Sequence, residues 1–472
     1  MYKTITKTAL AVAISATVSF SVLAVSTDQQ QQLDNAIAKT NQSQDEKIQE
    51  FHTYVNAYLD EYEAWRDEYI NNLDERRTSL IKTWGEGEVS SKTKQVDYSQ
   101  DDQVKVAVDY ENNTATVSVL VDKNSSDQEL EEFINKIPVE VAGQTVALTD
   151  LKAADHTVLY SFDKEQEEKN FVIEQTQSQM NELDVQAERL VQSNTGIPDS
   201  FIYQRAHTKK MALLAQAQER ITAQAILYKE MRAKHGIKVK QSDSVEQSNK
   251  TNQDIADIEL ASEQKTPESA TDISTTPTQL KKVVSYKVKL PENSLKSRAS
   301  QYTSLAEKES EQWAIDAALI MAIMHSESAF RPDAKSHVPA FGLMQIVPTS
   351  AGHDVNKQVR NIDAPMKAAD LYQPVINVET GTAYLNILNN KYLRKIDNDE
   401  SRLYCMIAAY NTGAGNVARA FNKDGSTNIA KASAVINKLT PKEVYNQLTT
   451  NLPYDETKNY LKKVNSRIQL YK

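Results

Sequence analysis

A short apolar segment, residues 316–328, carries one acidic side chain near its end and then runs into a proline-containing turn. Asp316 is suited to begin a helix, and the apolar positions after it recur at spacings of three and four. Glu327 is the only charged member of the resulting stripe. Apolar surroundings raise the pKa of a carboxyl group, which makes Glu327 a candidate general acid at neutral pH. A glutamate at the edge of such a stripe more often keeps its carboxylate in solvent, so the neighbouring sequence must decide between the two interpretations.

Three separate blocks of sequence occur in the order of a known family. They are Glu327-Ser328-x-Phe330-x-Pro332-x-Ala334-x-Ser336, Ala340-x-Gly342-Leu343-Met344-Gln345 and Ala409-Tyr410-Asn411-x-Gly413-x-Gly415. Together they resemble the lytic transglycosylases of the soluble-lytic-transglycosylase type, glycoside hydrolase family 23. The stretch from Lys438 to Val464 is similar to one branch, the membrane-bound murein transglycosylases of type C. The resemblance covers residues 283–472 and implies a helical, lysozyme-like domain there.

The resemblance also implies a chemistry for Glu327. Most glycosidases use two carboxylates, but Asp333 and Asp354, the nearest acids after Glu327, occupy no recognisable family position for a nucleophile. Lytic transglycosylases are understood to work with one glutamate. Glu327 would protonate the oxygen between MurNAc and GlcNAc in peptidoglycan. It would then take a proton from the MurNAc C6 hydroxyl, leaving a 1,6-anhydro-MurNAc end without consuming water.

Further residues of these blocks are expected to bind the glycan. The residues implied by the resemblance are Ser336, Met344, Gln345, Tyr410, Asn411, Glu456 and Tyr460. Ser336 would hydrogen-bond near the developing charge or cap its own loop, and Met344 would line the cleft or lie in the core. Tyr410 would hydrogen-bond close to the catalytic acid. Glu456 and Tyr460 would line the cleft, or else form a surface salt bridge and a packed ring.

Composition and charge exclude several other classes of function. The 472 residues carry a net charge of −10 without a basic run, so nucleic acid is not expected as a partner. The seven histidines show no metal-ligand spacing, and neither a metal nor another cofactor is expected. Cys405 is the only cysteine, which excludes an intramolecular disulfide and favours a buried core position. Without a cysteine near the N-terminus we expect no lipid anchor, a departure from the type C branch.

The first residues have the pattern of a secretory signal peptide. Lys3 and Lys7 precede an apolar run over residues 9–20, and Val22-Leu23-Ala24 offers a cleavage site after Ala24. The alternative is an uncleaved anchor, although the run is short for a membrane span. The pattern predicts a signal peptide over residues 1–24 and a periplasmic, envelope-associated location.

The remaining chain divides by composition into an accessory half and a helical C-terminal domain. Residues 48–160 combine a helical stripe of aromatic residues with a β-hairpin that turns at Asn112-Asn113, which predicts a small α+β accessory domain. Residues 165–235 predict long helices that break near Pro198, and residues 241–280 predict a flexible linker. A strand near 283–290 opens the predicted catalytic domain, 283–472, and in similar proteins joins the accessory sheet. The expected fold class is therefore mainly α.

The sequence leaves three functions open. The first is a periplasmic lytic transglycosylase acting on peptidoglycan glycan strands. The second is a hydrolytic lysozyme-type muramidase on the same fold, which would need a carboxylate to position water. The third is a catalytically idle cell-wall-binding protein whose N-terminal half engages a partner in the cell-wall machinery. The presence of Glu327, Gln345 and Tyr410 favours an active enzyme.

Overall fold

The computed structural model describes most of the chain between residue 44 and the C-terminus. The described residues are 44–126, 128–129, 132, 139–141, 144–146, 153–157, 160–192, 197–237, 281–291 and 293–472. The predicted signal peptide (1–24) and linker (241–280) lie outside them. The chain forms two compact units, residues 1–64 and 65–472, and the second contains the sheet and the C-terminal helices. Within the described ranges, no helix is long and apolar enough to cross a membrane.

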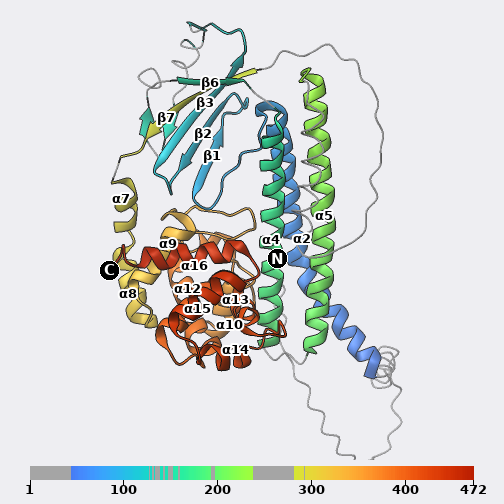
Figure 1. Ribbon diagram of the computed structural model, residues 1–472, viewed down its shortest axis with the longest axis vertical. Helices are drawn as coiled ribbons and strands as arrows, with labels where there is room; N and C mark the ends of the chain where they lie inside the picture. The colour runs from blue at the N-terminus through green and yellow to red at the C-terminus, as the bar shows by residue number, and fades with distance from the viewer. Residues whose placement is uncertain are drawn as a thin grey trace, which may run out of the picture. The chain divides into compact units, whose positions relative to one another are not determined.

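An antiparallel sheet forms the β part of the accessory region (Figure 1). Its strands are β1 (Lys94–Tyr98), β2 (Val104–Asp109), β3 (Thr114–Asp122), β6 (Ala153–Thr157) and β7 (Lys281–Lys289), in the order β1-β2-β3-β7-β6; β4 (Val139–Val141) and β5 (Gln144–Val146) form a separate pair. The predicted hairpin is confirmed as β2 and β3, with Asn113 at a positive φ of 53° in the turn. β7 lies between β3 and β6, with Tyr286 opposite Val117. The strand before the helical domain is therefore part of the accessory sheet, and the sequence-based domain boundaries stay predictions.

Three long helices accompany the sheet: α2 (Gln44–Trp84), α4 (Phe162–Gln192) and α5 (Asp199–Lys234). The break between α4 and α5 falls at Pro198, the N-cap of α5. Because α4 is rich in polar side chains, ion pairs join it to its neighbours: Arg232 of α5 lies 2.7 Å from Glu165, and Arg77 of α2 pairs with Glu168. These charges are buried, so removing one partner would leave the other uncompensated.

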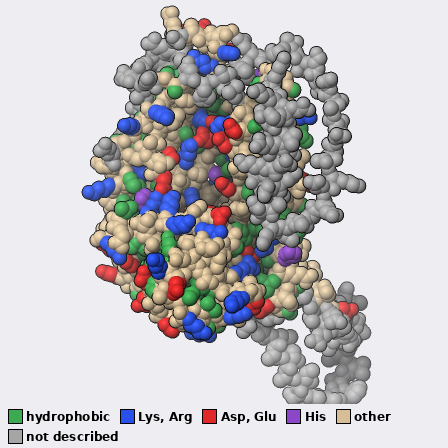
Figure 2. Space-filling model, in the orientation of Figure 1, with side chains coloured by type: hydrophobic (Ala, Val, Ile, Leu, Met, Phe, Trp, Pro, Cys, Tyr) green, Lys and Arg blue, Asp and Glu red, His purple; other side chains and the backbone are tan. Residues whose placement is uncertain are grey.

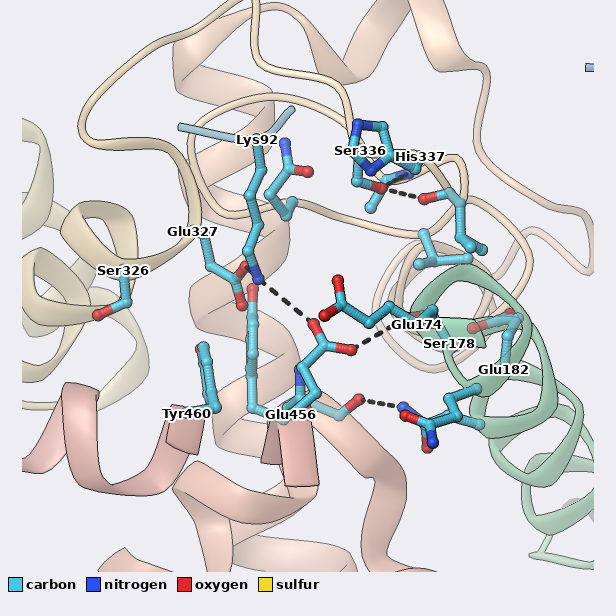
Figure 3. Close-up of a pocket in the computed structure, with 18 of the residues that line it drawn as sticks. Lys92, Glu174, Ser178, Glu182, Ser326, Glu327, Ser336, His337, Glu456 and Tyr460 are labelled. Carbon is cyan, nitrogen blue, oxygen red and sulfur yellow. Dashed lines mark hydrogen bonds and ion pairs between the residues drawn. The ribbon is translucent and has the colours of Figure 1, made fainter. Parts of the chain in front are cut away.

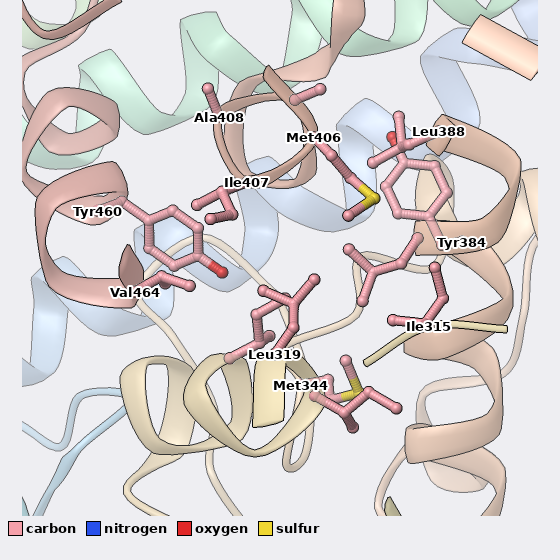
Figure 4. Close-up of a cluster of buried hydrophobic side chains, with 14 of the residues drawn as sticks. Ile315, Leu319, Met344, Tyr384, Leu388, Met406, Ile407, Ala408, Tyr460 and Val464 are labelled. Carbon is pink, nitrogen blue, oxygen red and sulfur yellow. The ribbon is translucent and has the colours of Figure 1, made fainter. Parts of the chain in front are cut away.

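The C-terminal part is a compact group of helices around one apolar core. The helices are α7 (Ser294–Ser300), α8 (Thr303–Trp313), α9 (Ala317–Ser328), α10 (Ala351–Gln358), α11 (Ala368–Leu371), α12 (Pro374–Ile387), the π-helix η2 (Leu388–Tyr392), α13 (Asp399–Phe421), α14 (Ile429–Ile436), α15 (Pro441–Asn451) and α16 (Asp455–Ile468). Figure 4 shows Leu319 of α9, Met344, Ile407 of α13 and Val464 of α16 gathered in this core. Cys405 is buried there as predicted. The fold is mainly α with a small antiparallel sheet, which confirms the expected class.

Helix α9 carries Glu327 and begins at the predicted cap. The Asp316 side chain accepts a hydrogen bond from the Ala318 backbone N–H at 2.8 Å, so the predicted N-cap is confirmed. The helix ends where Ala329 and Phe330 adopt positive φ angles of 50° and 64°. An amphipathic stripe was expected, but every residue from 318 to 328 is buried. A helix that is apolar nearly all round packs on all its sides.

Two details of the helical part concern a helix kink and the surface charge. Helix α13 kinks at Gly413, where φ is 80°, and continues to Phe421. On the surface, Figure 2 shows Lys, Arg, Asp and Glu side chains interspersed over the face in view. This mixed pattern agrees with the modest net charge and differs from the basic stripe of a nucleic-acid-binding face.

Candidate active site

A cleft of about 730 Å³ lies where the helical domain meets the accessory region. One wall comes from α9, α13, α16 and the loop around residues 336–347. The other comes from α4 and from the loop of residues 91–93 that precedes β1. Figure 3 shows the polar side chains that point into it from both walls. The accessory region therefore contributes directly to the space in front of Glu327.

Glu327 lies at the bottom of this cleft with only 5% of its surface exposed. Burial raises the pKa of its carboxyl group above the ordinary value, and the charge of Glu456 acts in the same direction. The ammonium of Lys92, 3.5 Å from Glu327 Oε2, opposes this and lowers the pKa. The net direction is upward, which favours the protonated carboxyl group more than in an exposed glutamate.

Lys92 stands between two carboxylates that come from different helices. Its Nζ lies 3.5 Å from Glu327 on α9 and 3.5 Å from Glu456 on α16 (Figure 3). Burial alone would lower the pKa of Lys92, but the charges of the two glutamates outweigh it and raise that pKa. Sequence reasoning missed this residue, since a single lysine in a loop far from the family motifs carries no periodic or motif signal.

Two tyrosines lie near the acid, and both line the cleft. Tyr460 lies beside Glu327, and its hydroxyl lowers the pKa of that carboxyl group (Figure 3). No well-formed hydrogen bond satisfies this buried hydroxyl within the described part of the chain. Tyr410 was expected to hydrogen-bond close to Glu327; it lines the cleft, but its hydroxyl donates to the Met344 carbonyl at 2.9 Å. Tyr460 is thus the tyrosine whose hydroxyl acts on the acid, and Tyr410 fixes the neighbouring turn.

Gln345 and Ser336 both line the cleft, and their own loops use their side chains. Gln345 Nε2 donates to the carbonyls of Ala334 (3.1 Å) and Gly342 (2.9 Å). Its Oε1 is buried without a hydrogen-bond partner among the described residues. The Ser336 hydroxyl donates to the Val338 carbonyl, which is the loop-cap alternative.

Met344 does not line the cleft. Its side chain is fully buried in the core. The Met344 sulfur packs so closely against Gly381 that a Cβ added to this glycine would lie only 2.4 Å from it. The expectation of a sugar-contacting side chain is corrected to the core alternative. The backbone of Met344 still serves the site, since its N–H donates to Asn377 Oδ1 at 2.8 Å and its carbonyl holds Tyr410.

Asn411 and Glu456 both line the cleft and connect its walls. The Asn411 carbonyl accepts from Asn181 Nδ2 of α4 at 3.0 Å, and its side-chain Oδ1 accepts from the Thr457 hydroxyl of α16 at 2.6 Å. Glu456 Oε2 accepts from the Ser178 hydroxyl of α4 at 3.0 Å. These contacts fix α4 against the helical domain and define the width of the cleft.

Helix α4 adds an acidic residue to the cleft that sequence reasoning did not single out. Glu182 is 6% exposed, and burial raises its pKa to about 7. Its two carboxyl oxygens accept from the hydroxyls of Thr349 (3.3 Å) and Ser350 (3.4 Å) in the helical domain. This group therefore titrates near neutral pH while it bridges α4 to the start of α10.

Residues 304–433 match the family model described as Transglycosylase SLT domain. The chain is 43% identical over 193 residues to a membrane-bound lytic murein transglycosylase C of Klebsiella pneumoniae subsp. pneumoniae, covering 41% of this chain and 52% of the relative. It is 42% identical over 202 residues to a protein of the same name from Sodalis glossinidius, covering 43% and 55%. The chain thus spans about half the length of these curated relatives.

Solved structures of lytic transglycosylases also share sequence with the chain. The 70 kDa soluble lytic transglycosylase of Escherichia coli is 26% identical, with a TM-score of 0.27 over 36% of this chain and 24% of that one. An inactive mutant of the lytic transglycosylase Slt of Pseudomonas aeruginosa is 25% identical, with a TM-score of 0.26 over 36% and 23%.

Proposed function

We propose that the protein is a peptidoglycan lytic transglycosylase in which Glu327 acts first as acid and then as base. The observation that carries the proposal is the buried carboxyl group of Glu327, which lines the cleft with a raised pKa and lies beside the ammonium of Lys92, within residues that match the transglycosylase SLT domain. A general acid must hold its proton at the working pH, and burial shifts the equilibrium of Glu327 toward the protonated form. The names of the relatives support murein as the substrate.

The reaction proceeds by two proton transfers at one carboxyl group. Protonated Glu327 donates to the oxygen between MurNAc and GlcNAc as the bond from MurNAc C1 to that oxygen breaks. Positive charge develops at C1, and Glu327 is left as a carboxylate. The carboxylate then takes the proton of the MurNAc C6 hydroxyl while O6 bonds to C1. Glu327 regains its proton, the product ends in 1,6-anhydro-MurNAc, and no water enters the balance.

Polar groups on both walls are placed to hold the sugars. Gln345, Asn411 and Glu456 line the cleft, which supports a role for their polar side chains in binding the sugars. The accessory region closes the cleft from its other side through α4 and the loop before β1. We therefore propose that the predicted accessory regions (48–160 and 165–235) act with the catalytic domain on one glycan strand. The predicted signal peptide supports a location in the cell envelope.

Mass spectrometry of the soluble products from purified peptidoglycan sacculi tests the proposal. The mature protein should release anhydro-muropeptides, and Glu327→Gln should release none. Glu311→Gln is the matched control, because it makes the same chemical change at an exposed position on α8. Reducing-end muropeptides would establish a hydrolase. Sacculus binding without any product would establish the cell-wall-binding alternative.

A further inference from the structure

The lysine that touches Glu327 belongs to the accessory region and not to the transglycosylase domain. Lys92 lies just before β1, and its side chain retains 30% exposure while it reaches both Glu327 and Glu456. The matched family domain begins at residue 304. The contact therefore joins the acid of one part of the chain to a cation from another.

The loop that carries Lys92 is fixed on both sides. Toward the sheet, Ser91 N–H donates to the Lys94 carbonyl at 2.8 Å. Toward the helical domain, the Ser91 carbonyl accepts from Arg331 Nη1 at 3.4 Å, and the Ser90 carbonyl accepts from His337 Nε2 at 2.8 Å. Such anchoring reduces the entropy that a free lysine side chain on a mobile loop would lose on pairing. The position of Lys92 is thus set by the way the two parts dock.

The groups that face Glu327 come from each element packed against it. The groups that act on Glu327 are Lys92 of the loop before β1, Tyr410 of α13, and Glu456 and Tyr460 of α16. Lys463 of α16, Glu174 of α4 and His337 of the loop after α9 also line the cleft. Lys463 is held 3.1 Å from Glu111. Burial lowers the pKa of His337 to about 4, so this ring is neutral at pH 7. Among the described residues, Lys92 is therefore the cation within ion-pair distance of Glu327.

We propose that Lys92 is a positioning residue that sets the acidity of Glu327 and holds the Glu327 and Glu456 side chains at their places across the cleft. The inference rests on the proposed function, because it concerns the acid of that reaction. An ammonium 3.5 Å away favours the carboxylate that Glu327 becomes once it has donated its proton. Burial favours the protonated form before donation. The two effects oppose each other, which keeps the carboxyl group able both to hold its proton and to release it.

This arrangement makes the acidity of Glu327 depend on a charge from the accessory region. If the ammonium of Lys92 is removed while the loop stays in place, Glu327 keeps the burial that raises its pKa but loses the positive charge that opposes it. The pKa of Glu327 then rises further, so the carboxyl group becomes a weaker acid.

The test is the pH dependence of kcat/KM on solubilised, uncrosslinked glycan strands, measured with the whole mature protein. Activity requires protonated Glu327, so kcat/KM should fall at alkaline pH. The position of this alkaline limb of the pH profile reports the pKa of Glu327 in the free enzyme. Lys92→Met should move the limb upward by about 1 pH unit, the lower end of the effect of a close opposite charge. Lys92→Arg should leave it near the wild-type position because the charge is kept.

Lys94→Met is the matched control for lost charge. Lys94 lies two residues further along and pairs with Glu88, so its removal should leave the limb unchanged. An unmoved limb in Lys92→Met, or a limb that moves equally in Lys94→Met, would overturn the proposal. A higher kcat/KM at an unmoved limb would instead make Lys92 an obstruction that substrate must displace. Failure of the proposed function is distinguishable, since wild-type protein would then release no anhydro product at any pH.

Discussion

Replacing Gly342 by alanine tests how the turn after α9 builds the cleft wall. The residue has a φ of +76°, and an added Cβ would lie 2.3 Å from the Leu371 carbonyl oxygen and 2.4 Å from Asn377 Nδ2. Asn377 is fully buried; its amide donates to the carbonyls of Phe341 (2.8 Å) and Leu371 (2.7 Å), and its oxygen accepts from Met344 N–H. The methyl group would thus enter the hydrogen-bond network that holds the turn.

The expected cost of Gly342→Ala has two parts. A left-handed backbone at a non-glycine residue costs roughly 1–2 kcal/mol. Breaking a buried hydrogen bond so that its partners stay unsatisfied adds about 1–3 kcal/mol. We therefore expect the free energy of unfolding to fall by about 2–5 kcal/mol. Activity should also fall, because Gln345, three residues on, lines the cleft.

Urea unfolding of both alanine variants provides the measurement. Gly425→Ala is the control, because its φ is +66° and nothing lies within 4 Å of an added Cβ. It should lose only the backbone part, about 1–2 kcal/mol, and keep its activity. Equal destabilisation of Gly342→Ala and Gly425→Ala would refute the reasoning, since the packed network would then contribute nothing.

Three further predictions concern the cleft walls. Burial raises the pKa of Glu182 to about 7, so the folded state holds a proton that the unfolded chain loses above pH 4.5, and wild-type stability falls as pH rises across this window. Glu182→Gln should remove this dependence and gain up to about 3 kcal/mol above pH 7 in urea titrations; a pH-independent difference would contradict it. Asn181→Ala should lower the free energy of unfolding by about 1–3 kcal/mol, because the Asn411 carbonyl loses its donor. Limited proteolysis should then cut α4 sooner than in the wild-type protein, and an unchanged rate of cleavage would count against the contact. Tyr460→Phe should lower kcat/KM roughly 10-fold or more without loss of stability, since its hydroxyl acts on Glu327 yet has no well-formed partner in the described residues; equal losses of both would indicate a packing role.

Local chemistry allowed several elements of both parts of the chain to be predicted. The Asp316 cap, the apolar run after it and the hairpin at Asn112-Asn113 are short-range signals, and each produced the expected element. The same signals predicted a stripe on α9 where the structure buries the whole helix, because periodicity does not report how many neighbours pack around an element.

The cleft was predicted only where its residues lie in the family blocks. Tyr410 and Tyr460 were both expected there, but which hydroxyl acts on Glu327 depends on where Met344 places its carbonyl. Lys92 and the α4 residues come from segments far away in sequence. Their polar side chains look like ordinary solvated positions until the tertiary fold brings them to the cleft, so no spacing rule could identify them.

The central claim, a reaction without water, is tested most directly by digesting sacculi in water enriched in oxygen-18. The MurNAc C6 oxygen should form the new bond to C1, so the anhydro products released by wild-type protein should contain no oxygen-18. Incorporation of one oxygen-18 atom at C1 of the released MurNAc would contradict the account. It would show that a water molecule attacks where we assign the substrate's own hydroxyl.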